Sequence, residues 1–193
     1  MPDAIQSSPL AGKLAGLRQL LRVDGRDCTL SEVALQGMLN LRGDAQDAGF
    51  VQAVLQHTGL HLPVRANTAS IDLQRQLLWL GPDEWLFKCQ DMDSDGVASV
   101  LRQALAGQHV ALTDVGHGNV TLCVQGPAAA DLLARGCPLD LHSRTFARGA
   151  VAQTHIAKAG ATLLCLEAGL HFEITVRRSF ADYLVRWLIS AGE

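Results

Sequence analysis

The stretch LCVQGPAAADLLARGCPLDL, residues 122–141, decides the fold, because a related stretch occurs earlier in the chain. The earlier copy is LNLRGDAQDAGFVQAVLQHTGLHLP, residues 39–63, and in both a short apolar run leads into a glycine, a helical segment and a second glycine. Further on, LLCLEAGLHFEIT at 163–175 corresponds to LLWLGPDEWLFKC at 77–89. The offset is roughly 83 to 86 residues throughout, which predicts a duplicated β-α-β-β-β-α unit.

Turn residues and apolar periodicity place the elements within each copy. Strands are expected at 30–42, 66–72, 75–80 and 84–90, and again at 110–115, 120–125, 150–157, 161–167 and 170–177. Helices are expected after Asp44, after 93–95, after Gly126-Pro127 with proline at the first helical position, and from Ser179 as N-cap. The last helix is expected to bury a stripe that includes Phe180.

This pattern predicts the fold class and the domain organisation. We expect an α+β fold in which each repeat packs helices on one face of an antiparallel sheet. A single domain at 30–193 would contain two pseudo-repeats, at about 30–108 and 109–193, related by a pseudo-twofold axis. Residues 1–29 are expected to form an N-terminal arm.

Composition excludes several classes of function. The chain has 193 residues, of which 48% are hydrophobic and only 18% charged, and a surface with few charges is often covered by a partner. The net charge of −3 gives no basis for binding nucleic acid. No apolar run approaches the roughly 20 residues that cross a bilayer, and the start of the chain does not resemble a signal peptide.

The cysteines indicate the compartment. There are five, an odd number, and none belongs to a C-x-x-C pair, so neither a disulfide framework nor a zinc ribbon is indicated. We therefore expect reduced thiols in a cytoplasmic protein.

Adjacent carboxylates at Asp83 and Glu84 are the first candidate for acid–base chemistry. Neighbours on a strand point to opposite faces, so the two cannot act on one substrate atom without a distorted backbone. We expect Asp83 to accept backbone N–H bonds in the Gly81-Pro82 turn, and Glu84 to meet an arginine or solvent.

Histidine and cysteine candidates are equally weak. His57 and His61 are four residues apart, but Gly59 interrupts the helix that would align them, and His171 with Glu173 gives a set of only two ligands. Cys137 follows a helix C-terminus, where the dipole disfavours a thiolate, so a buried structural thiol is expected.

Two further groups are candidates for contacts. Asp114 and His117 could form a dyad across a turn, but no serine or cysteine nucleophile is placed with them, and a hairpin hydrogen bond suffices. Arg177 and Arg178 precede the last helix, where paired cations are unfavourable for the dipole. They require a partner, and an internal carboxylate such as Asp140 and a neighbouring subunit are equally good candidates.

Three strings carry a resemblance to a known family: LGPDEWLF at 80–87, ARGCPLDLH at 134–142 and RRSFADYLVRWL at 177–188. In this order and spacing they resemble the gamma subunit of heterotetrameric sarcosine oxidase, over about Leu41 to Ala191. The resemblance implies structural or subunit-contact roles for the signature positions, which are Gly81, Pro82, Asp83, Trp85, Cys137, Pro138, Asp140, Arg178 and Phe180.

The same resemblance implies an accessory, non-catalytic subunit. The whole enzyme oxidises sarcosine with O2 and tetrahydrofolate to glycine, methylenetetrahydrofolate and hydrogen peroxide. The partners implied are the alpha, beta and delta subunits, with alpha in direct contact. FAD, FMN, NAD, tetrahydrofolate and zinc would belong to the rest of the complex, and this chain would bind no cofactor and contain no catalytic or metal-binding residue.

A second likeness concerns the fold. TDVGHGNVTLCVQGPAAADLL at 113–133 is similar to the opening of the aminomethyltransferase T-protein family, whose members bind tetrahydrofolate. Asp114, His117, Gly126 and Ala129 match, whereas Gly116 stands where a serine is usual. The turn at 159–162 lacks the paired aspartates of that family, so the resemblance implies the folate-binding domain's fold more than its site.

Three hypotheses follow from the sequence. The first is the gamma subunit of sarcosine oxidase. The second is a free-standing folate-binding or one-carbon-transfer protein, which the likeness at 113–133 favours. The third is a homo-oligomeric scaffold, for which only the low charge content argues.

Overall fold

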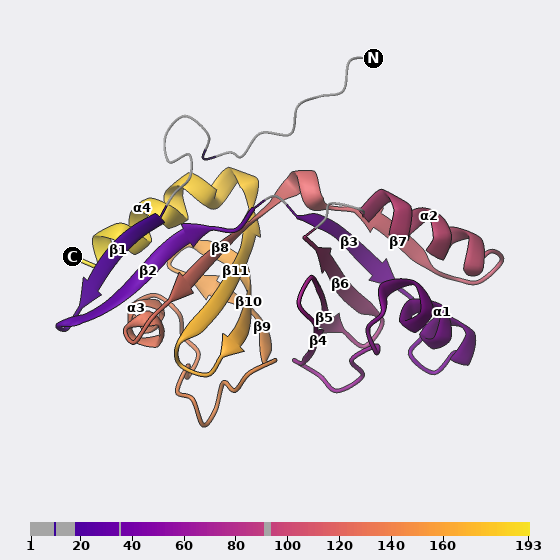
Figure 1. Ribbon diagram of the computed structural model, residues 1–193, viewed down its shortest axis with the longest axis horizontal. Coiled ribbons are helices and arrows are strands. Elements are labelled where there is room, and N and C mark those ends of the chain that lie inside the picture. Colours follow the sequence, from indigo (N-terminus) through magenta and orange to yellow (C-terminus); the bar gives the residue numbers. More distant parts are fainter. Residues whose placement is uncertain (1–9, 11–17, 35, 91–93) are drawn as a thin grey trace, which may run out of the picture. The chain divides into compact units, whose positions relative to one another are not determined.

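The computed structural model describes residue 10 and residues 18–34, 36–90 and 94–193. Within this part, the chain divides into two compact units. Unit 1 contains the residues up to Val33 together with His117–Arg148 and Gln153–Glu193, and unit 2 contains Ala34–Gly116 and Gly149–Ala152. Each unit consists of one antiparallel sheet and its helices (Figure 1). Among the described residues, no helix is long and apolar enough to cross a membrane.

Unit 2 contains a five-stranded sheet with the order β4-β5-β6-β3-β7. Its strands are β3 (Gly37–Arg42), β4 (Ala69–Ile71), β5 (Arg75–Gly81), β6 (Glu84–Cys89) and β7 (Ala111–Asp114). Helices α1 (Ala48–Thr58) and α2 (Ser94–Ala104) pack on one face, where Phe50, Val54 and Leu101 join a buried cluster with the inward residues of the strands. Burial of this apolar face stabilises unit 2.

Helix α1 is capped at both ends by residues suited to that role. The carboxylate of Asp47 accepts hydrogen bonds from the backbone N–H groups of Gly49 and Phe50, at 2.7 and 3.2 Å. The N-cap is therefore Asp47, three residues after the predicted Asp44, which instead closes a turn with the N–H of Gln46. The predicted stop at Gly59 is confirmed, since its φ of 76° is left-handed.

Unit 1 contains a six-stranded sheet with the order β1-β2-β8-β11-β10-β9. Its strands are β1 (Arg18–Val23), β2 (Arg26–Glu32), β8 (Asn119–Gln125), β9 (Val151–Ile156), β10 (Ala159–Glu167) and β11 (His171–Arg177). Two 3-10 turns, η1 (Gly116–Gly118) and η2 (Arg178–Phe180), flank strands of this sheet. The helices are α3 (Ala129–Ala134) and α4 (Ala181–Ala191).

The predicted duplication is confirmed in the strand order. The series β4-β5-β6-β3 in unit 2 matches β9-β10-β11-β8 in unit 1. Even the irregularities correspond, because β5 carries a bulge between Trp79 and Gly81, and β10 carries one between Cys165 and Glu167. The α+β class with duplicated β-α-β-β-β-α units is therefore the observed fold.

Each sheet also contains a strand that, in the sequence, comes just before the first strand of the other repeat. β2 lies just before β3 in the chain but pairs with β8, from Thr29 opposite Gln125 to Glu32 opposite Leu122. Conversely, β7 lies just before β8 but pairs with β3, from Leu39 opposite Asp114 to Arg42 opposite Ala111. The expected single strand at 30–42 is therefore wrong, since β2 and β3 belong to different sheets.

The expectation of an N-terminal arm at 1–29 fails for residues 18–29. They form most of a hairpin in which Asp24 and Gly25 adopt φ values of 49° and 78°, as a tight two-residue turn with the twist of its strands requires. Leu21, Val23, Cys28 and Leu30 are buried, so the hairpin is anchored in unit 1 by its own apolar residues. The boundaries of the two units accordingly differ from those of the predicted pseudo-repeats.

The helix starts in unit 1 also differ from expectation. α3 begins at Ala129 with Ala128 as N-cap, rather than with Pro127 as its first residue. η2 precedes α4, so the N-cap is Phe180 and not Ser179, and Phe180 is 43% exposed instead of buried. The stripe that α4 does bury consists of Ala181, Leu184, Val185 and Leu188.

Candidate functional site

The Gly81-Pro82-Asp83 turn joins β5 to β6, and its carboxylates bind one arginine. Arg42 on the neighbouring strand β3 lies 3.2 Å from Asp83 and 2.6 Å from Glu84. Glu84 also accepts a hydrogen bond of 2.7 Å from the amide of Asn40. Glu84, for which an arginine or solvent was expected, thus meets Arg42. The side chain of Asp83 also pairs with Arg42, so the expectation that it accepts backbone N–H bonds in the turn is wrong. Both carboxylates form ion pairs with an arginine on the neighbouring strand, and these ion pairs link the strands of the sheet. Because both carboxylates are engaged in this way, the arrangement does not favour a role for them as a catalytic acid and base.

Asp83 stabilises this corner through its main chain as well. Its carbonyl oxygen accepts a hydrogen bond of 3.2 Å from the N–H of Gly43. The corresponding bond in unit 1 runs from the N–H of Gly126 to the carbonyl of Leu170, at 2.8 Å. The repeats therefore share a backbone link between the end of the first strand and the turn before the last strand.

Trp85 lies at the centre of the core of unit 2. Its side chain is fully buried and packs against Phe50 with ring centroids 5.6 Å apart. The indole N–H donates a hydrogen bond of 2.8 Å to the carbonyl oxygen of Pro63, which satisfies the only polar atom of the side chain. All of these contacts of Trp85 lie within unit 2.

Cys137, Pro138 and Asp140 begin the long loop between α3 and β9. Cys137 is buried and its Sγ lies 3.9 Å from the hydroxyl of Thr154, whereas Pro138 is exposed. The carboxylate of Asp140 accepts hydrogen bonds from the backbone N–H of His142 at 3.0 Å and from the hydroxyl of Thr145 at 2.9 Å. These bonds, the one from His142 first, lower the pKa of Asp140, so it stays ionised and braces the loop.

The same loop borders a groove of about 470 Å³ in unit 1. Apolar groups of α3 and of the β10–β11 turn form part of its wall, including Ala130 and Leu170. Charged and polar groups form the rest, and among them Arg26 and Asp131 make an ion pair of 2.5 Å. Asp140 is the signature residue that this groove includes.

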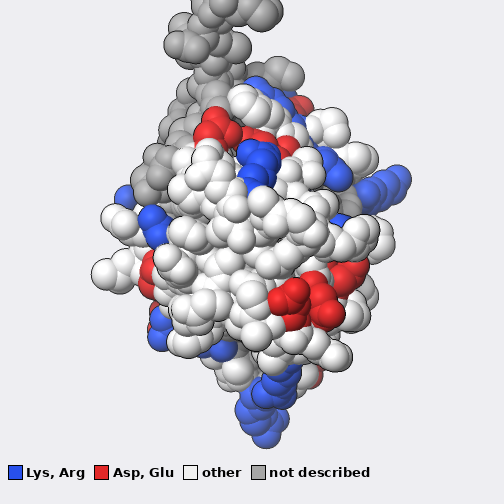
Figure 2. Space-filling model, turned by 90° about the vertical axis from the view of Figure 1, so that its right-hand side faces the viewer, with Lys and Arg blue, Asp and Glu red and all other residues white. Residues whose placement is uncertain are grey.

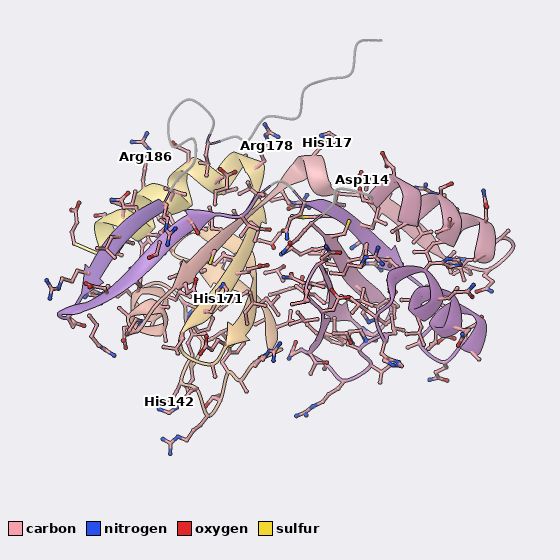
Figure 3. All side chains as sticks on the ribbon, in the orientation of Figure 1. Asp114, His117, His142, His171, Arg178 and Arg186 are labelled. Carbon is pink, nitrogen blue, oxygen red and sulfur yellow. The ribbon has the colours of Figure 1, made fainter. Side chains whose placement is uncertain are left out.

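Arg178 and Phe180 lie together in η2, before α4. Phe180 is 43% exposed, which fits a contact surface better than a core position. Asp140 is ruled out as the internal partner of Arg177 and Arg178. Among the described residues, its side chain binds only groups of its own loop. Figure 3 shows Arg178 near the start of α4 and His142 on the long loop.

Two histidine-bearing sites complete the list of candidates. The carboxylate of Asp114 accepts a hydrogen bond of 2.7 Å from the N–H of Gly116, so it closes its own turn. His171 lies 3.2 Å from the thiol of Cys123, a contact that the sequence did not reveal. Burial raises the pKa of Cys123, and the nearby Glu173 adds to this, so the thiol stays protonated and is a poor nucleophile.

Across the residues that the structure describes, no three His, Cys, Asp or Glu side chains gather in a way that could hold a metal ion. Figure 2 shows one face of the molecule, on the side of α1 and α2, where uncharged residues separate small groups of acidic and basic ones. No broad basic surface for nucleic acid is visible on that face.

The sequence of this chain is similar to those of several known proteins. The family model described as "Sarcosine oxidase, gamma subunit family" matches residues 42–193. The sarcosine oxidase gamma subunit of Corynebacterium sp. strain U-96 is 33% identical over 97% of this chain and 90% of its own length. The gamma subunit of an Arthrobacter species is 31% identical over 84% of this chain and 78% of its own.

Solved structures give the same answer for the fold. A chain of the heterotetrameric sarcosine oxidase from Corynebacterium sp. U-96, in complex with pyrrole 2-carboxylate, matches with a TM-score of 0.87 and 31% identity, covering 97% of this chain and 95% of that one. Aminomethyltransferase T from Bartonella henselae matches with a TM-score of 0.60 and 17% identity, over 85% of this chain and 46% of that one, which shows the shared fold alone. The chain belongs to the sarcosine oxidase gamma subunit family.

Proposed function

We propose that this chain is the non-catalytic gamma subunit of a heterotetrameric sarcosine oxidase. The observation that carries the proposal is the match to a chain of the Corynebacterium enzyme over nearly the full length of both, at 31% identity and a TM-score of 0.87. The complex would oxidatively demethylate sarcosine to glycine. O2 would be reduced to hydrogen peroxide, and the released carbon would pass to tetrahydrofolate as methylenetetrahydrofolate.

An accessory role is supported by the state of the candidate residues. The carboxylates at 83 and 84 are engaged with Arg42, and Asp114 is engaged with the N–H of Gly116. Cys137 is buried, and the pKa of Cys123 is raised. What remains for this chain is assembly: it would hold other subunits in place rather than touch the substrate.

The partners and cofactors follow from the same proposal. The alpha, beta and delta subunits would surround this chain, with alpha in direct contact. FAD, FMN, NAD, tetrahydrofolate and zinc would be bound by those subunits. All five cysteines are free thiols, which fits work in the cytoplasm.

Coexpression with the neighbouring large subunits tests the proposal. We expect this chain to co-elute in stoichiometric amount with a yellow, flavin-bearing complex, and sarcosine oxidation to be lost when it is omitted. Sarcosine oxidation by the purified chain alone would contradict the non-catalytic role. A colourless chain that elutes alone and binds tetrahydrofolate in a titration would instead support an independent folate-binding protein.

A further inference from the structure

We propose that the outer edge of β1, at Arg18–Val23, is the docking surface for an extended segment of a neighbouring subunit. The segment would add a seventh strand to the six-stranded sheet of unit 1. The inference rests on the proposed function, because the occupant belongs to another subunit of the sarcosine oxidase complex. It deepens that function by naming the surface of this chain that receives a partner and the conformation of the segment that binds there.

The first observation is that β1, at the edge of its sheet beside β2, turns hydrogen-bonding groups outward (Figure 1). A two-residue turn separates Val23 from Arg26, so these two form a hydrogen-bonded pair, and every second residue before Val23 directs its N–H and C=O away from β2. Arg22 follows this alternation, since its N–H donates a bond of 3.3 Å to the carbonyl of Gly192, outside the sheet. Leu20 is the next such residue, and within the described part of the chain its outward groups have no hydrogen-bond partner.

The second observation is that the chain itself partly occupies the other sheet edges. On β4, the N–H of Ala69 donates a hydrogen bond of 2.9 Å to a carbonyl of the loop before β9. At the start of β9, the N–H of Val151 donates one of 2.9 Å to the carbonyl of Asn67. On β7, the guanidinium of Arg102 donates one of 3.3 Å to the carbonyl of Leu112. Among the described residues, the edge of β1 is bonded in this way only near its turn, so its first half has room for another strand.

The third observation is an exposed leucine on a strand that is otherwise firmly held. Leu21 and Val23 are 4% and 0% exposed and anchor β1 in unit 1, so the edge is ordered before a partner binds. Leu20 lies on the opposite face and is 68% exposed. One exposed leucine is common on protein surfaces, but this one lies on an open sheet edge. A residue of an added strand would lie about 5 Å from it and cover it.

The charges beside Leu20 indicate what kind of chain pairs with this edge. Arg18 and Arg22 are exposed on the same face as Leu20, two residues before and after it. In an antiparallel pair of two copies of this chain centred on Leu20, each Arg18 would face the Arg22 of the other copy, and like charges directly opposite are destabilising. Asp27 lies 3.6 Å from Arg22 but leaves the arginine side chain 73% exposed. The occupant is therefore a different chain, with an apolar residue opposite Leu20 and no cation opposite the arginines.

Two substitutions at one position test the backbone edge. L20A removes the exposed side chain and keeps the N–H, whereas L20P removes both, and proline is tolerated where the N–H points out of an edge strand. Each variant, with its fold verified by circular dichroism, competes with the wild-type chain for incorporation into the coexpressed complex. We expect L20A to lower incorporation about threefold and L20P to lower it about tenfold further. L73A is the control, because Leu73 is 95% exposed at the β4–β5 turn, and it should incorporate like the wild type.

Hydrogen exchange at single residues provides the second measurement. The amide of Leu20 should exchange readily in the isolated chain and about tenfold more slowly in the complex, whereas that of Leu21, bonded to β2, should be protected in both. Protection of Leu20 already in the isolated chain would overturn the proposal, because the chain would then cover its own edge. Unchanged exchange at Leu20, with full incorporation of L20P, would overturn the edge pairing while the proposed function stands. A wild-type chain that never enters the complex would overturn both.

Discussion

The indole N–H of Trp85 donates a hydrogen bond of 2.8 Å to the carbonyl oxygen of Pro63, inside a core where the tryptophan is fully buried. This bond links β6 to the connection that follows α1, twenty-two residues earlier in the chain. It also explains why a tryptophan occupies this signature position. A purely apolar side chain of similar size would leave the carbonyl of Pro63 without its donor.

Replacement of Trp85 by phenylalanine should therefore destabilise the chain. We expect a loss of about 1–3 kcal/mol in the free energy of unfolding, from the missing hydrogen bond and the smaller ring together. Urea denaturation followed by circular dichroism measures it. The matched control is W79F, because Trp79 is only half-buried at the edge of the same core. An equal effect of both substitutions would contradict the role given to the buried hydrogen bond.

Gly126 provides a test of the N-terminal hairpin. Its φ of 132° suits glycine alone, and a Cβ atom placed there would lie 2.8 Å from the carbonyl oxygen of Asp27 on β2. We expect G126A to destabilise the chain by about 2–4 kcal/mol. G160A is the control, since nothing lies within 4 Å of a Cβ atom at Gly160. A fully stable G126A would mean that β2 does not pack against this position.

The repeat could be predicted from the sequence because glycines and apolar runs recur locally. Gly43 and Gly126 end the first strand of each copy, and Gly59 and Gly136 follow each helix. The exchange of β2 and β7 between sheets could not be predicted in this way, because it joins residues far apart in the chain. Asp24-Gly25 was a usable turn signal, but the flanking run RQLLRV alternates too weakly to mark a strand.

The candidate site was less predictable than the fold. For Glu84 the sequence left an arginine and solvent equally open, and nothing in it singled out Arg42, which lies on another strand. The order of the loop at 137–149 could not be predicted either, because it depends on two buried apolar anchors. Those anchors, Leu141 and Phe146, belong to no periodic pattern, because an irregular loop has none.

The carboxylate of Asp140 should make stability depend on pH in the acid range. Its pKa lies below the ordinary value of 3.8 because the folded loop donates two hydrogen bonds to the charged form. A lowered pKa means that the stabilisation is fully present above the ordinary value and is lost as the pH falls through the lowered one. The free energy of unfolding of D140N should thus lie below that of the wild type at neutral pH.

The acid range supplies the check on Asp140. The difference between wild type and D140N should shrink below pH 3.8, as the wild-type carboxyl also becomes protonated. T145A removes one of the two donors, so its effect should be intermediate. Unfolding curves at a series of pH values measure all three chains. A difference that grows on acidification would show that the sign of the effect is wrong.

Neutralising the carboxylates at 83 and 84 should not impair the chemistry of the complex. Because both bind Arg42, we expect D83N and E84Q to change the rate of sarcosine oxidation by the assembled enzyme less than about twofold. Stability should fall by no more than about 1 kcal/mol, since the arginine is half exposed to solvent. R42Q is the matched variant and should reproduce the small loss of stability. A loss of two or more powers of ten in kcat would show that these carboxylates take part in catalysis.

The five free thiols should differ sharply in their reaction with a thiol reagent. Cys28, Cys89, Cys137 and Cys165 are buried, whereas Cys123 is half-buried beside His171. Since only the thiolate reacts, and burial raises the pKa of Cys123, even this thiol should react slowly near pH 7.5 and faster as the pH rises.

Reaction with 5,5′-dithiobis(2-nitrobenzoic acid) measures these classes. The folded chain should show a single accessible thiol, which C123S removes, and denaturant should release all five in the wild type. C137S is the control. Because the thiol of Cys137 is buried, its removal should not change the reaction of the folded chain with the reagent. Rapid reaction of Cys123 at neutral pH would show that His171 draws the proton from the thiol, and a nucleophilic role for the pair would then have to be considered.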